Sequence, residues 1–164
     1  LDAEVVVSLY LLLKWVHILS SVVLVGTGFG TAFFFFYANR SGVVAAQAVV
    51  ARLVVRADTW FTSPAVVIQP ITGLWMAYLA GYPWTTPWLL LTVALYLFTG
   101  ACWTPVVALQ LRMADMAQAA HAKNESLPEL YWQYARRWEA LGYPAFIAML
   151  AVFYLMVAKP ALWA

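Results

Sequence analysis

The sequence predicts an all-α integral membrane protein, a bundle of four transmembrane helices. Of its 164 residues, 65% are hydrophobic and only 10% are charged, whereas about 25% are charged in a typical soluble domain. The mean hydropathy of +0.81 indicates that lipid is the solvent. Long apolar runs recur without the alternation of barrel strands. Because unpaired backbone amides are costly in hydrocarbon, these runs are predicted to be helices.

Four spans follow from the apolar runs, and we expect them to form one transmembrane domain over residues 1–164. The N-terminal run lacks the positive region and the cleavage site of a secretory signal, so we interpret it as a retained span. The expected spans cover residues 11–37, 60–79, 89–110 and 141–158.

The connections between the spans carry helical signals of their own. Residues 43–58 are amphipathic and predict an interfacial helix before the second span. The polar segment 112–139 contains Ser126-Leu127-Pro128-Glu129, a predicted capping box. We therefore expect a cytoplasmic helical extension that leads into the fourth span.

The charges predict the orientation in the membrane. Most Lys and Arg residues fall in the first and third connections, and by the positive-inside rule those connections are cytoplasmic and both termini are outside. We therefore expect a multi-pass protein of a bacterial inner membrane. The residues concerned are Arg40, Arg52, Arg56, Arg112, Lys123, Arg136 and Arg137, with Lys14 and Lys159 toward the other side.

His17 is the histidine at membrane depth, and it has two interpretations. It shares a sector of its helix with Ser20, Ser21, Gly28 and Thr31. Its simplest role is a hydrogen bond to a Ser, a Thr or a carbonyl of another helix. The functional alternative is an axial ligand of a b-type haem, because a neutral imidazole inside a bundle suits haem iron.

Other residues complete the candidate haem site. Met76 and Met156 are candidates for a second ligand, although a Met in a span usually packs. Lys14 is either a propionate partner or a snorkelling anchor. Arg52 and Arg56 are either an anion clamp or a solvated interfacial face.

A second group of residues predicts helix packing. Gly26 and Gly30 form a G-x-x-x-G pair, which lets two membrane helices approach closely. Gln69 and Gln110 lie on the polar stripes of the second and third spans, where they are expected to bond between helices.

Several classes of protein are excluded by their missing motifs. The sequence has no Ser-His-Asp set, no HExxH and no P-loop, and GTGFGT lies inside a span rather than before a soluble helix. Cys102 is alone, so no internal disulfide forms. The formal charge of +2 is too small to indicate nucleic acid.

The apolar runs resemble those of a family of uncharacterised bacterial four-helix membrane proteins of unknown function. The runs that carry this resemblance are LLLKWVHILSSVVLVGTGFGTAFFF, FTSPAVVIQPITGLWMA, TTPWLLLTVALYLFTGACWTPVVALQLRM and ALGYPAFIAMLAVFYLMVAKP. More distantly, His17 followed by small residues, PA…TGLW from Pro64 to Trp75, and the closing VAKP are similar to HemJ-type protoporphyrinogen oxidases and copper-resistance D proteins.

The HemJ-type resemblance implies a b-type haem protein with His17 as an axial ligand. The third helix of HemJ-type proteins has a histidine in a polar pattern near its start. The third span of this chain has Thr92, Tyr96 and Thr99 instead, so ligation of a haem by two histidines is not available. We therefore expect a haem-binding membrane redox protein, which is a candidate membrane oxidoreductase. The alternative is a non-catalytic accessory or assembly subunit, in a homo-oligomer or a larger complex in the lipid bilayer.

Overall fold

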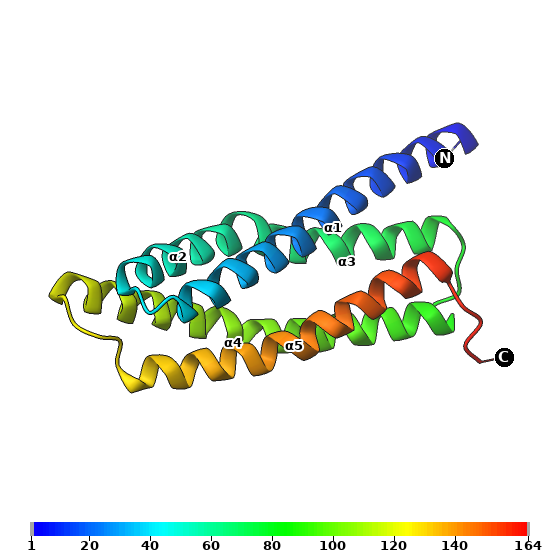
Figure 1. Ribbon diagram of the computed structural model, residues 1–164. Helices are drawn as coiled ribbons and strands as arrows, with labels where there is room; N and C mark the ends of the chain where they lie inside the picture. Colours follow the sequence, from blue (N-terminus) through cyan, green and yellow to red (C-terminus); the bar gives the residue numbers. More distant parts are fainter. Residues whose placement is uncertain (1, 164) are drawn as a thin grey trace. The chain divides into compact units, whose positions relative to one another are not determined.

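The computed structural model describes residues 2–163, and all regular elements in that part are helices (Figure 1). The all-helical class is therefore confirmed. The elements are α1 (Ala3–Arg40), α2 (Val44–Ala57), the π-helical turn η1 (Asp58–Thr62), α3 (Ser63–Leu79), α4 (Pro87–Lys123) and α5 (Glu129–Ala158).

Three helices are long and apolar enough to cross a membrane: α1, α4 and α5. The second expected span falls on η1 and α3. With 17 residues, α3 is about 26 Å long at 1.5 Å per residue. That length is at the lower limit for a bilayer core of about 30 Å.

The helix ends follow from local backbone chemistry. Gly42 and Gly81 adopt φ values of +69° and +72° in the turns after α1 and α3, a conformation that glycine adopts without a steric penalty. Helix α5 stops at Lys159, which has φ 43° and is followed by Pro160. Proline cannot continue a helix, so α5 ends at Ala158, before Lys159 and Pro160.

The predicted capping box before α5 is wrong. The helix begins at Glu129, its N-cap is Pro128, and no side chain caps it. A box would need Leu127 and Pro128 inside the helix after Ser126. Pro128 disfavours helical dihedrals at Leu127, the residue before it, so a helix that includes Leu127 is unfavourable.

The expected helix between the first two spans is present as α2, and it passes directly into the π-helical turn η1. In η1, the Thr62 hydroxyl donates to Asp58 Oδ1 at 2.8 Å and the Ser63 hydroxyl donates to Asp58 O at 2.9 Å. Pro64 follows at once, and its ring would clash with the carbonyl four residues back in a regular helix. That carbonyl belongs to Trp60, inside the wider turn.

The chain forms two compact units. The first comprises the described residues up to Gly42 together with Arg52–Pro83, and the second comprises Val43–Ala51 with the described residues from Trp84. In the first unit, α1 packs along η1 and α3. In the second, α4 packs along α5, as Figure 1 shows.

The second unit has a packed core beyond the expected spans. Met113, Ala117 and Tyr131 are fully buried there. The start of α2 belongs to this unit, and the Gln118 Nε2 donates to the carbonyl of Ala48 at 2.7 Å. This side-chain bond joins the start of α2 to α4 within the second unit.

We predict that Ala117→Leu destabilises this core. The Ala117 side chain is fully buried, so added methylenes overpack it at a cost of about 1–3 kcal/mol. Ala119→Leu is the matched control, because Ala119 is exposed on the same helix. Thermal unfolding in detergent measures the difference, and equal melting temperatures for the two variants would contradict the predicted packing.

Candidate functional site

A polar cluster joins α1 to α3 in the first unit, and His17 lies at its centre. The His17 Nδ1 and the Thr72 hydroxyl oxygen are 2.8 Å apart. The Gln69 Nε2 donates to the backbone carbonyl of His17 at 3.1 Å. Gln69 and Thr72 are both buried. The cluster therefore fixes both the imidazole and the backbone of His17 against α3.

The bonding of Thr72 indicates which His17 nitrogen carries the proton. The Thr72 hydroxyl has one hydrogen, and the carbonyl oxygen of Ile68 accepts it at 2.7 Å, with that of Gln69 also near at 3.2 Å. When the hydroxyl donates to Ile68 in this way, it accepts from Nδ1–H of His17. In this tautomer Nε2 keeps its lone pair and is the nitrogen able to bind a metal.

Gly73 allows the imidazole to lie against the backbone of α3. A Cβ built at Gly73 would lie 2.9 Å from Cε1 of His17 and 3.7 Å from Nε2. Any side chain there would occupy the space beside the ring. Glycine at this position is therefore a requirement of the close approach between α1 and α3.

The structure places the other candidate haem residues on three different helices. Lys14 lies one turn earlier on α1 and is exposed, and Met76 lies one turn after Thr72 on α3 and is half-buried. Met156 lies on α5, in the second unit.

The structure does not bring Arg52 and Arg56 to the imidazole. Both lie exposed on α2, and Arg56 precedes Gly73 by 17 positions, which is about 25 Å of helix at 1.5 Å per residue. A single porphyrin ligated at His17, beside Gly73, does not span the distance to Arg56. We therefore leave the two arginines out of the site around His17.

The residues expected to pack helices also differ in their surroundings. A Cβ at Gly26 or Gly30 would have no heavy atom within 4 Å, so the pair makes no close helix contact in the described part of the chain. Gln69 bonds to α1, as stated above. Gln110 is buried on α4, and its Oε1 has no hydrogen-bond partner among residues 2–163.

Sequence reasoning missed two features of this region. The close approach at Gly73 gives no pattern of its own, because Gly73 has no second glycine four residues away. Its signal was the position of Gly73 on the same stripe as Gln69. The π-turn that begins at Asp58 was also missed. Its signal was Pro64 shortly after the hydrogen-bonding side chains of Asp58, Thr62 and Ser63.

The site has one imidazole and no cluster of metal ligands. Within residues 2–163, no group of three or more His, Cys, Asp or Glu side chains is placed to hold a metal ion. A closed protein-only metal site needs about four such ligands. A haem differs, because the porphyrin supplies four nitrogens and the protein needs to add only one or two ligands.

The fold and the site together define a helical integral membrane protein with a polar contact between two of its helices. Residues 11–160 match the family model described as predicted integral membrane protein (DUF2269), and the chain belongs to this family. No curated protein and no solved structure matches the chain. The first resemblance described above is thus confirmed, and the HemJ-type similarity stays an expectation.

We predict that Gly73→Ala displaces His17 and destabilises the first unit. The new Cβ would lie 2.9 Å from the imidazole, and overpacking of this kind costs about 1–3 kcal/mol. Gly28→Ala is the control, because a Cβ at Gly28 meets nothing within 4 Å. Thermal unfolding of both variants tests this, and a Gly73→Ala protein that melts at or above the parent would refute the close approach.

Proposed function

We propose that the chain crosses a bacterial inner membrane four times with both termini outside. Three helices have the length and hydropathy of spans, and α3 with the preceding π-turn would supply the fourth. The distribution of Lys and Arg supports this orientation. The helices α1 and α3 would then contact each other through His17, Thr72 and Gln69 inside the hydrocarbon region.

The orientation predicts the behaviour of topology reporters. A reporter fused after Ala164 should be active only outside the cytoplasm, and a reporter inserted after Lys123, at the end of α4, should be active only inside. At each of the two sites, one fusion carries an enzyme that is active only outside the cytoplasm and another carries a fluorophore that is fluorescent only inside. The two signals together report on which side each site lies. The reverse pattern would overturn the orientation, and two fusions active on one side would overturn the number of spans.

We infer that His17 is an axial ligand of a b-type haem and that the chain is a membrane redox protein. The observation that carries this proposal is the hydrogen bond between Nδ1 of His17 and Thr72, with the Thr72 hydrogen directed to its own helix. Ligating histidines typically donate the second ring N–H in this way, which orients the ring and raises its basicity.

The residues around His17 fit this role. Nε2 would be left with its lone pair, and Gly73 lets the ring pack against α3, which fixes its position. Gln69 holds the backbone of His17 in place. Lys14 would pair with a propionate, and Met76 would supply a second ligand from the same unit. A haem bound here would supply one-electron transfer to or from a quinone, a porphyrinogen or a partner protein.

The second candidate is a non-catalytic accessory or assembly subunit. It is favoured by a different observation: the face of α1 that carries Gly26 and Gly30 has open space beside both glycines. Such a face would accept a helix of a neighbouring copy or of a larger membrane complex. In that case the bonds of His17 would only hold α1 to α3.

A visible absorption spectrum separates the two candidates. Under the haem proposal, the parent purified after expression with ample haem shows a Soret band, and His17→Ala is inserted in the membrane but colourless. His121→Ala is the control, because His121 is exposed near the end of α4, and it should keep the band. A parent without Soret absorbance would end the haem proposal.

Thr72→Val tests the role of the hydrogen bond itself. The variant removes the acceptor for Nδ1–H but keeps His17, and lost support of this kind weakens binding by about 10–100-fold. Thr99→Val is the control, because the Thr99 hydroxyl donates to the carbonyl of Leu95 on its own helix. Titration of the apoprotein with haem measures both affinities. Equal affinities would show that Thr72 does not orient the ligand.

A further inference from the structure

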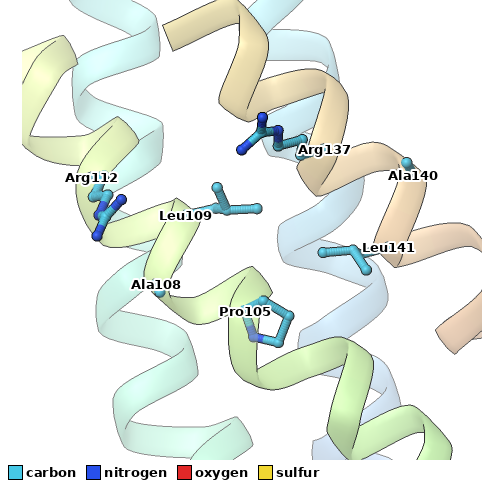
Figure 2. A pocket seen from close by; sticks show the side chains of 7 residues that line it. All are labelled: Pro105, Ala108, Leu109, Arg112, Arg137, Ala140 and Leu141. Atoms are coloured by element: carbon cyan, nitrogen blue, oxygen red, sulfur yellow. The ribbon is translucent and has the colours of Figure 1, made fainter. Parts of the chain in front are cut away.

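A cavity of about 450 Å³ lies between α4 and α5, within the second unit (Figure 2). It has an apolar part and a cationic part. Figure 2 shows Leu109 and Leu141 in the space between the two helices, with Arg137 extending from α5 toward α4. The lining residues are Pro105, Ala108, Leu109, Arg112, Arg137, Ala140 and Leu141.

The two arginines have no acidic partner among the described residues. The Arg112 Nη1 donates to the Tyr134 hydroxyl at 3.3 Å, and its guanidinium lies over the Tyr134 ring at 5.9 Å from the centroid. Both contacts are with a neutral side chain. Arg137 makes no ion pair there either, whereas its neighbour Arg136 pairs with Glu129 at 3.0 Å. Within the described residues, the cavity therefore has two positive charges without an ion-pair partner.

The cavity lies where both helices change from apolar to charged. On α4 the apolar run from Leu89 to Leu111, about 33 Å at 1.5 Å per residue, ends directly before Arg112. On α5 the apolar run begins at Leu141, directly after the charged turn that contains Arg137. A run of 33 Å matches a bilayer core of about 30 Å, which would place the arginines at headgroup depth and the leucines at acyl depth.

We propose that this cavity binds an anionic phospholipid, with its phosphodiester on Arg112 and Arg137 and the start of an acyl chain against Leu109, Leu141 and Pro105. Guanidinium groups bind phosphate through paired N–H donors. Basic pockets between membrane helices are known to bind anionic headgroups. The apolar wall distinguishes this site from one for free phosphate, because a phosphate ion gains nothing from contact with leucine.

The test is a comparison of lipid binding by native mass spectrometry, with the full chain released from detergent. Phosphatidylglycerol and phosphatidylcholine are titrated separately, and inorganic phosphate is added as a competitor. We expect the parent to bind phosphatidylglycerol more tightly than phosphatidylcholine. Arg112→Gln and Arg137→Gln should each weaken phosphatidylglycerol binding about fivefold, the effect of one basic residue near a membrane surface.

Arg136→Gln is the matched control. It removes the same charge one position from Arg137, but Arg136 does not line the cavity. It should keep the affinity of the parent. Arg137→Lys, which keeps the charge, should retain most of the preference for phosphatidylglycerol, and it keeps the test decisive if a glutamine variant does not fold.

Three results would overturn the proposal. The first is equal binding of the two lipids by the parent. The second is a loss in Arg136→Gln as large as that in Arg137→Gln, which would reduce the effect to net charge. The third is displacement of phosphatidylglycerol by millimolar inorganic phosphate, which would assign the cavity to a free anion.

Discussion

The hydrogen bond between His17 and Thr72 is the interaction on which the first unit depends. In hydrocarbon no water replaces a missing partner, so a polar side chain on one helix determines which face of another helix it must meet. Thr72 and Gln69 lie on the face of α3 that meets α1, and Gly73 lies beside them without a side chain. The imidazole therefore determines how closely α1 and α3 pack, whether or not it also binds iron.

The helices themselves could be predicted from the sequence, because hydrocarbon enforces them. The ends of α1 and α5 are visible as Gly42 and Pro160, since both residues act through their own backbones. The prediction of a capping box at Ser126 failed, because it did not take into account that Pro128 disfavours helical dihedrals at Leu127. The rule for a single residue took precedence over the four-residue pattern.

The partners within the site could be predicted only in part. Periodicity placed His17 and Gln69 on polar stripes, and a Ser or Thr was named as one partner type for the imidazole. Which threonine it would be, and which glycine would allow close packing, depends on the axial offset of two helices, and no single sequence records that offset. The G-x-x-x-G pair had the better-known pattern, yet the ring contact is at Gly73. The arginines of α4 and α5 show the same limit, because 25 positions separate Arg112 from Arg137 in the sequence.

The long sequence separation of the central contact affects how the chain is made. Thr72 follows His17 by 55 positions, and ribosomes add about 5–20 residues per second. Helix α1 therefore waits about 3 to 11 seconds before its partner exists. The contact that joins α1 to α3 therefore cannot form until α3 has been made, whereas the hydroxyls of Ser21 and Thr31 bond to carbonyls of α1 itself.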